Sequence, residues 1–126
     1  METISNFVGD KGLYGLFNNA GIAFGSPPSK STAIEYERLE SYRQVMEVNF
    51  FGVVQVTQAF LPLLRKGKGR IIMNASIAGF FGSPYVSPYT ASKFALEGFS
   101  DSLRREVLPL GVSVSILEPG YVVSQI

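Results

Sequence analysis

The stretch Arg70-Ile-Ile-Met-Asn-Ala-Ser76, followed shortly by Ser87-Pro-Tyr-Thr-Ala-Ser-Lys93, decides the fold of this chain. The first run is apolar and ends in small polar residues, which is typical of a buried β-strand. The second opens with Ser87, expected as a helix N-cap, before a proline at the first helical position. A helix is predicted from there to about Leu108, where a proline and a glycine end it.

Tyr89 and Lys93 stand four residues apart in this predicted helix. Positions i and i+4 share one helix face, so a phenol and an ammonium would lie side by side. A free tyrosine has a pKa of roughly 10. A unit charge ~4 Å away, at an effective dielectric of ~20, is worth about 4 kcal/mol. One well-placed lysine would therefore bring the phenol pKa close to neutrality, where general acid–base catalysis is efficient.

Strand-like and helix-like segments alternate on the N-terminal side of this pair. Residues 14–17 are predicted as a short apolar strand that ends at the turn-forming cluster Asn18-Asn-Ala-Gly21. Residues 25–31 form a loop rich in Pro, Ser and Gly. Apolar positions then repeat at helical spacing over about 36–64, where Pro62 is expected to bend or shorten the last turn.

A third strand is predicted over 112–117, where β-branched residues are frequent, and it ends before Pro119-Gly120. Strands alternating with helices predict an α/β fold, a partial Rossmann-type doubly wound parallel sheet of about three strands and two long helices. Ligands of such sheets bind beyond the carboxyl ends of the strands. We therefore expect residues 18–21, 74–76 and Pro119-Gly120 to meet Tyr89 at one edge of the sheet.

Composition narrows the function classes. A chain of 126 residues with 46% hydrophobic and 17% charged residues is one globular domain or part of one. The absence of Cys and His excludes disulfide scaffolds, thiolate or imidazole zinc sites and Ser-His-Asp triads, and no metal site is expected. The basic run at 65–70 fits a helix end better than a nucleic-acid patch. No apolar run reaches the ~18 residues of a membrane span, and a cytoplasmic location is expected.

Taken in order, these motifs resemble the short-chain dehydrogenase/reductase family over nearly the whole chain. Each piece is weak alone, but the order and the distances are specific. The matching pieces are Asn18-Asn-Ala-Gly21 after a strand, Asn49 in the next helix, Ser76 after the next strand, Tyr89-x-x-x-Lys93 and Pro119-Gly120. The resemblance implies an NAD(P)-dependent oxidoreductase that interconverts a secondary alcohol and a ketone by hydride transfer.

The resemblance also implies the catalytic roles. Tyr89 would exchange a proton with the substrate oxygen, and Lys93 would lower the tyrosine pKa and hold the nicotinamide ribose. Ser76 would hydrogen-bond the substrate oxygen. Asn49 would anchor a water that links Lys93 to solvent as a proton relay.

The cofactor implied by the resemblance is NAD or NADP, between which the sequence does not choose. Ser124 stands where the family often has Thr for the nicotinamide carboxamide, and it keeps the hydroxyl. The expected cofactor-binding residues are Asn18, Asn19, Ala20, Gly21, Tyr89, Lys93, Pro119, Gly120 and Ser124.

The chain departs from the family pattern in its missing Gly-rich phosphate loop. Residues 1–126 are therefore expected to be the C-terminal part of a single dinucleotide-binding domain, with about half of the cofactor site absent. Residues 25–33 also make a longer loop than is usual in the family. An alternative is a non-enzymatic truncated subunit that associates with a full-length relative, and a third is an unrelated α/β binding domain.

The expected partners follow from the same resemblance. Small residues at helical spacing are expected to let the last helix approach another element closely: Ala91, Ala95, Gly98 and Ser102. The two long helices commonly form the subunit interface in the family, so a homo-oligomer is expected, without nucleic acid or a membrane span. The substrate is expected to be a small hydrophobic molecule, as in retinol- and hydroxysteroid-type members. The expected wall of its pocket is Phe80, Phe81, Tyr85 and Val86, although these side chains fit core or subunit contacts equally well.

The missing phosphate loop generates a prediction about the isolated chain. Without that loop, the 126-residue chain should bind NADH and NADPH poorly and turn over slowly or not at all. Fluorescence titration of the monodisperse chain with each dinucleotide checks this. Binding at micromolar concentration would contradict it.

Overall fold

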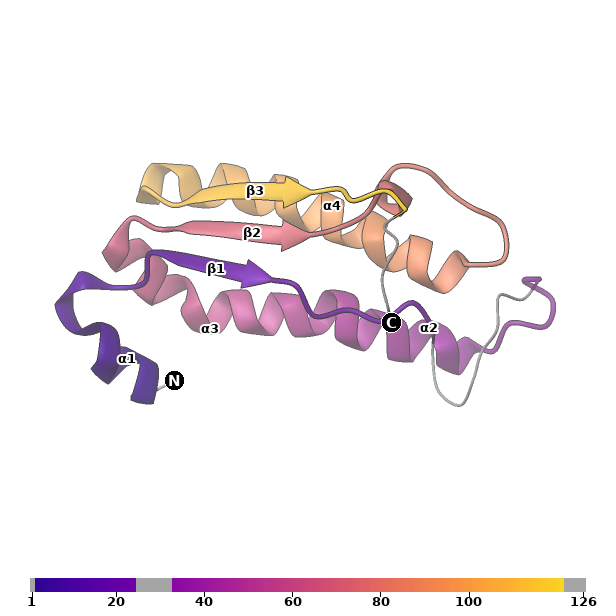
Figure 1. The fold of residues 1–126 in the computed structure, drawn as a ribbon, viewed down its shortest axis with the longest axis horizontal. Helices are drawn as coiled ribbons and strands as arrows, with labels where there is room; N and C mark the ends of the chain where they lie inside the picture. The colour runs from indigo at the N-terminus through magenta and orange to yellow at the C-terminus, as the bar shows by residue number, and fades with distance from the viewer. Residues whose placement is uncertain (1, 25–32, 122–126) are drawn as a thin grey trace.

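The computed structural model describes residues 2–24 and 33–121. Its sheet has three parallel strands in the order β1 (Gly15–Asn18), β2 (Arg70–Asn74) and β3 (Ser113–Leu117), as Figure 1 shows. In the register, β1 pairs directly with β2 and β2 with β3. The predicted parallel α/β sheet is confirmed, and the carboxyl ends of its strands point the same way.

One long helical segment joins β1 to β2. It consists of α2 (Leu39–Met46), the π-helical turn η2 (Glu47–Phe51) and α3 (Gly52–Gly67). The helix expected over 36–64 is thus confirmed, with a later start and a later end. Pro62 does not shorten it, because fully buried Leu64 holds the last turn against the core.

A second long helix, α4 (Ser87–Val107), joins β2 to β3 and is extended by the 3-10 turn η4 (Leu108–Leu110). Its predicted end is confirmed, but the expected N-cap is wrong. Ser87 is the first helical residue, and Val86 before it makes no side-chain cap. The Ser87 hydroxyl instead lies 2.6 Å from the Tyr42 hydroxyl on α2, so a long-range contact replaces the local cap.

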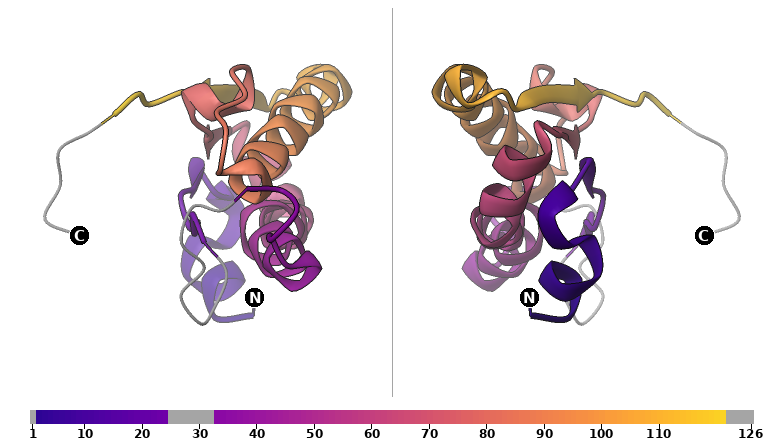
Figure 2. Two further views of the ribbon diagram at one scale, coloured as in Figure 1. Left: turned by 90° about the vertical axis from the view of Figure 1, so that its right-hand side faces the viewer. Right: turned by 90° about the vertical axis from the view of Figure 1, so that its left-hand side faces the viewer.

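Both long helices lie on the same side of the sheet (Figure 2). On that face the alternating strand residues are buried and meet the apolar stripes of α3 and α4. The core consists of Val53, Leu64, Ile71, Met73, Ala75, Leu96, Leu103, Val107, Val112 and Val114. On the opposite face, Phe17 is 53% and Leu117 47% exposed, since no described helix covers them. The described residues therefore form one helical layer and a sheet.

Three short elements were not expected. They are α1 (Glu2–Val8) with the following 3-10 turn η1 (Gly9–Lys11), and the 3-10 turn η3 (Ile77–Gly79) between β2 and α4. The predicted 25–31 loop and Ser124 lie outside the described residues, as does all but the end of the 25–33 segment.

By length and composition alone, the continuous helix Leu39–Gly67 qualifies to cross a membrane, which the sequence did not lead us to expect. Within the described residues it is the one helix that does so. Two of its buried polar side chains are hydrogen-bonded inside the fold, Asn49 to Ile22 and Thr57 to Asn18. Helices in the core of water-soluble proteins meet the same two criteria, so the criteria assign no membrane span.

Substitution of alanine for glycine should have opposite effects on stability at two positions, Gly69 and Gly98. A Cβ on Gly69 would collide with the carbonyl oxygens of Leu13 and Tyr14, whereas a Cβ on Gly98 would meet no atom within 4 Å. Gly69→Ala should lower the free energy of unfolding by about 3 kcal/mol. Gly98→Ala should raise it by about 0.5–1 kcal/mol, because alanine is the better helix former. Urea denaturation measures both, and equal effects would contradict the close approach at Gly69.

Candidate active site

Tyr89 and Lys93 lie one turn apart on the first half of α4, as predicted. The Lys93 Nζ atom lies 5.5 Å from the centroid of the Tyr89 ring. It also donates a hydrogen bond of 2.7 Å to the carbonyl oxygen of Asn74 at the end of β2. Burial lowers the pKa of Lys93, and the nearby Glu97 carboxylate acts in the opposite direction. The ammonium is therefore held in one place between the helix and the sheet.

Asn49 connects the loop after β1 to α4 from the middle of the π-helical turn. Its Oδ1 accepts from the Ile22 amide and its Nδ2 donates to the Ile22 carbonyl, each at 2.8 Å. Nδ2 also donates to Ser92 Oγ at 2.9 Å, and Ser92 donates to the Tyr89 carbonyl at 2.7 Å. Single π-helical turns are frequent at functional sites. Here the π-helical turn places the buried Asn49 amide where it connects, through Ser92, to the backbone of Tyr89.

The backbone at Gly21 approaches the Asn49 side chain and the Lys93 ammonium. A Cβ there would lie 3.3 Å from Asn49 Oδ1 and 3.9 Å from Lys93 Nζ. A side chain at residue 21 would therefore press on the Asn49 amide and occupy the space beside the ammonium. Such close backbone approach is a common reason for glycine at a ligand site.

The two asparagines that precede this glycine have structural partners. Asn18 is buried, and its Nδ2 donates to Thr57 Oγ1 at 3.0 Å and to Met73 Sδ at 3.3 Å. Asn19 accepts from Asn74 Nδ2 at 2.8 Å. The Asn18 side chain thus points into the core between β1 and α3, and Asn19 ties the carboxyl ends of β1 and β2 together.

Ser76 begins the turn after β2. Its Oγ accepts from the Ala78 amide at 3.2 Å, which caps η3. The backbone amide of Ile77, the residue directly after Ser76, donates to the Pro119 carbonyl at 3.1 Å. The ends of β2 and β3 are thereby joined at the edge of the sheet, as expected from strand order.

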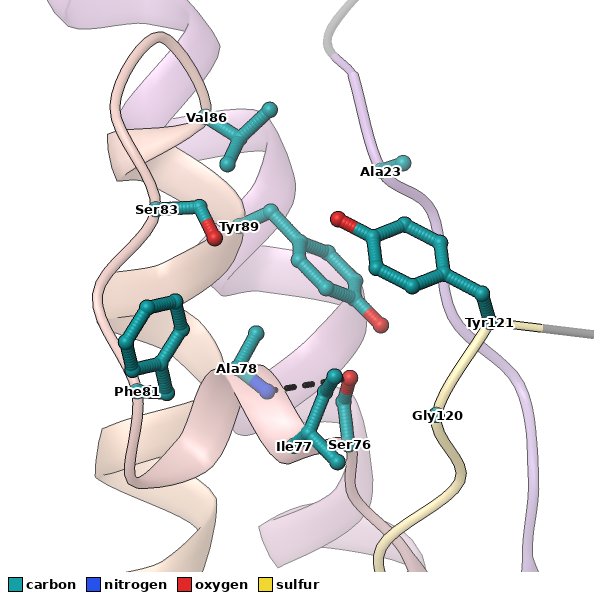
Figure 3. Close-up of a pocket in the computed structure, with 10 residues that line it drawn as sticks. All are labelled: Ala23, Ser76, Ile77, Ala78, Phe81, Ser83, Val86, Tyr89, Gly120 and Tyr121. Carbon is teal, nitrogen blue, oxygen red and sulfur yellow. Dashed lines mark hydrogen bonds between the residues drawn. The ribbon is translucent and has the colours of Figure 1, made fainter.

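Ser76 and Tyr89 share a cavity of about 330 Å³. In Figure 3 their hydroxyl groups point toward one another, and Tyr121 faces Tyr89 from the chain that follows β3. No residue in the lining carries a charge. The lining residues are Ala23, Ser76, Ile77, Ala78, Phe81, Ser83, Val86, Tyr89, Gly120 and Tyr121.

The structure brings some of the predicted residues together and separates others. Lys93 and Asn49 support Tyr89 from behind and are not part of the cavity lining. Phe81 and Val86 line it as expected, whereas Phe80 and Tyr85 are not among its lining residues.

Ala20 and the two asparagines line a separate groove beside β1. Sequence reasoning missed Ser92, Ser83 and Tyr121. For Ser92 one signal existed, since a polar residue falls on the predicted buried face of a helix next to Lys93.

This arrangement can move a proton. Two hydroxyl groups converge where a substrate oxygen would accept or donate hydrogen bonds, and a buried ammonium behind the phenol stabilises negative charge that develops on it. A tyrosine, a lysine and a serine at the carboxyl ends of a parallel sheet are the arrangement expected of an α/β oxidoreductase.

The chain belongs to the short chain dehydrogenase family, whose model matches residues 2–126. It is 47% identical over 123 residues to the mitochondrial D-beta-hydroxybutyrate dehydrogenase of Mus musculus, covering 95% of this chain and 34% of the relative. It is 46% identical to the 17-beta-hydroxysteroid dehydrogenase type 6 of Bos taurus, covering 95% and 36%. The chain thus spans about a third of the length of these relatives.

Solved structures support the same fold. A short-chain dehydrogenase from Streptomyces avermitilis superposes with a TM-score of 0.81 at 30% identity, over 99% of this chain and 45% of that one. NAD⁺-bound xylitol dehydrogenase superposes with a TM-score of 0.82 at 26% identity, over 95% and 45%. The partial Rossmann-type fold expected from the sequence is therefore confirmed.

The buried ammonium predicts a distinct pH dependence. Because the folded-state pKa of Lys93 lies below the ordinary lysine pKa of 10.5, the unfolded chain binds more protons between the two values. The stability of the wild type relative to Lys93→Met should therefore rise as the pH increases through that window. Urea denaturation at a series of pH values measures the difference. The same series for Lys11→Met, which removes an exposed lysine, should show no such rise; a similar rise there would count against burial of Lys93 as the cause.

Proposed function

We propose that this chain carries the acid–base half of an NAD(P)-dependent oxidoreductase that interconverts a secondary alcohol and a ketone. The single observation that carries the proposal is the cavity in which the Ser76 and Tyr89 hydroxyls converge, with Lys93 buried behind the phenol. The names of the relatives support it, since both are dehydrogenases that act on hydroxyl-bearing molecules.

The reaction assigns a task to each hydroxyl group. In the oxidative direction, Tyr89 Oη takes the proton of the substrate hydroxyl group while a hydride leaves the carbon that bears this hydroxyl group. Ser76 Oγ donates a hydrogen bond to the substrate oxygen and keeps it within reach of the phenol. Lys93 stabilises the phenolate that accepts this proton, and its bond to the Asn74 carbonyl prevents it from turning away.

The residues present fit the nicotinamide end of a dinucleotide. When bound, the cofactor accepts or supplies the hydride. Lys93 and Tyr89 would hold its ribose hydroxyls beside the backbone of Asn19, Ala20 and Gly21, where the missing Cβ leaves room. Ser124, which lies outside the described residues, is proposed to meet the carboxamide. The chain has no Gly-rich loop for the phosphates, so a dinucleotide needs residues beyond this chain.

Asn49 is proposed to act mainly by positioning. Both hydrogens of its amide are used, one for Ile22 and one for Ser92. Oδ1 already accepts from Ile22, which leaves one lone pair for a relay water that leads to Lys93. The water relay implied by the family resemblance is thus compatible with these hydrogen bonds. Only one position on the Asn49 side chain, the second lone pair of Oδ1, remains to anchor its water.

The substrate is proposed to be a small neutral hydrophobic alcohol or ketone. The cavity walls are apolar at Ile77, Ala78, Phe81 and Val86. Because no lining residue carries a positive charge, the described part of the pocket offers no ion pair to a carboxylate substrate. The hydroxysteroid dehydrogenase relative supports the same class.

Association through the long helices is a second proposal. Apolar side chains remain exposed along them: Val48 36%, Phe51 46%, Val56 40% and Phe94 46%. A Cβ added to Gly98 would meet no atom within 4 Å, so this face of α4 is open and a partner helix can approach closely there. Such a contact would serve both a homo-oligomer and the alternative subunit without activity of its own. Gly98→Ala should then weaken association in sedimentation equilibrium, and a purely monomeric chain at high concentration would refute the proposal.

The acid–base role is tested in a chimera. This chain replaces the matched segment of the mouse D-beta-hydroxybutyrate dehydrogenase, which supplies the rest of the dinucleotide domain. Tyr89→Phe should lower kcat for alcohol oxidation about 10²- to 10⁴-fold, because it removes the proton acceptor and little else. Formation of reduced nicotinamide cofactor is followed by absorbance.

Tyr85→Phe is the matched control for the chimera. Tyr85 belongs to the same loop region, is 59% exposed and does not line the cavity, so its loss should leave kcat unchanged. An active chimera in which Tyr89→Phe behaves like Tyr85→Phe would refute the assignment of Tyr89.

A further inference from the structure

Glu97 lies one helical turn beyond Lys93 on α4 and has no task in the proposed reaction. Its side chain packs directly against the turn η3. A Cβ on Gly79 would lie 2.8 Å from Glu97 Cγ and 3.0 Å from its Oε1. Glu97 Oε1 is buried and has no hydrogen-bond partner among the described residues. A half-buried carboxyl group thus fills the space that the missing side chain of Gly79 leaves.

The turn above this carboxyl group carries Ser76. We call residues 76–79 the Ser76–Gly79 turn. Its amides donate three hydrogen bonds. Two stay within the turn, from Gly79 to the Ser76 carbonyl at 2.8 Å and from Ala78 to Ser76 Oγ at 3.2 Å, and one reaches from Ile77 to the Pro119 carbonyl at 3.1 Å. A group that presses on Gly79 therefore acts on the Ser76 hydroxyl and on Pro119 together.

Among the described residues, Glu97 makes no direct ion pair. Lys93 donates to the Asn74 carbonyl, and Arg104 to the Val114 carbonyl and to Asp101. The Ser76–Gly79 turn has no titratable side chain. Beyond β3, Glu118 repels the Glu97 carboxylate. Burial raises the pKa of Glu97, Glu118 and Asp101 add to the rise, and Arg104 and Lys93 oppose it, while α2 and η2 contribute no charge to this balance.

We propose that Glu97 is a positioning residue of the site, whose neutral carboxyl group supports the Ser76–Gly79 turn and whose ionised form loosens it. An ionised carboxylate with one buried and unpaired oxygen is costly, whereas a neutral carboxyl group carries an O–H that can donate to a nearby carbonyl. Ionisation also adds repulsion toward Glu118, which directly precedes Pro119. Support of the turn stands on these contacts, and only its importance for substrate binding rests on the proposed function.

Hydrogen exchange in the intact chain tests the proposal without any need for turnover. Mass spectrometry follows protection of the peptide that contains the Ser76–Gly79 turn between about pH 4 and pH 8, corrected for intrinsic exchange rates. In the wild type, protection should fall about two- to tenfold as Glu97 ionises, the equivalent of one hydrogen bond. In Glu97→Gln, which keeps the shape and stays neutral, this fall should be absent.

Glu106→Gln removes a carboxylate from the exposed side of the same helix and should keep the fall. A flat wild-type profile, or a fall that survives in Glu97→Gln, would overturn the proposal. The sign for stability follows from the raised pKa of Glu97. Its contribution to stability is full below the ordinary glutamate pKa of 4.5 and is lost as the pH rises through the folded-state pKa. Glu97→Gln should therefore be more stable than the wild type near neutral pH and equal to it in acid.

A double substitution tests the contact itself. Gly79→Ala should reduce protection of the turn, because the new Cβ meets Glu97, and Gly79→Ala with Glu97→Ala should restore at least half of the loss on a logarithmic scale. If the double variant is no better than Gly79→Ala, the contact is not what supports the turn. Inactivity of the chimera would refute the proposed reaction but would leave these exchange results unchanged.

Discussion

The hydrogen bond from the Lys93 ammonium to the Asn74 carbonyl is the contact on which the rest of the site depends. It joins the first half of α4 to the end of β2, and so it fixes a helix face against a strand end. A buried ammonium is costly unless it is paired, which the lowered pKa of Lys93 reflects. This cost falls where the proposed reaction needs a positive charge beside the Tyr89 phenol.

Around this hydrogen bond, polar side chains hold neighbouring segments together by hydrogen bonds, whereas apolar packing does so in the rest of the molecule. Asn49 holds the loop after β1 and, through Ser92, the backbone of Tyr89. Nearly all of these groups have partners, as buried polar groups require. Their connection makes the loop, the helix and the strand end one rigid unit. The cavity beside it is lined mainly by apolar residues and by none that carries a charge. Among the hydroxyl groups of its lining, those of Ser76 and Tyr89 are the two that we propose to act on the substrate.

The parts of this site that follow from local rules were predictable from the sequence. The spacing of Tyr89 and Lys93 on a helix, and the position of Ser76 just after an apolar strand, depend on residues near one another in the chain. The failures all depend on distant contacts. The Ser87 hydroxyl lies against the Tyr42 hydroxyl and does not cap its own helix, and the burial of Leu64 keeps the helix intact beyond Pro62. Phe80 and Tyr85 differ from Phe81 and Val86 only through the path of one loop, which no periodicity encodes.

The π-helical turn at Glu47–Phe51 has a consequence for how one helix can serve two neighbours. Its buried positions on either side repeat every four residues: Ser41, Val45, Asn49, Val53 and Thr57. In a regular α-helix of 3.6 residues per turn, each step of four overshoots a full rotation by about 40°, so the stripe would rotate by about 160° from end to end. The wider turn absorbs part of this rotation. The helix therefore acts as two segments offset in phase, α2 facing α4 and α3 facing β1. Asn49 sits at the joint between them, where its orientation is determined from both sides.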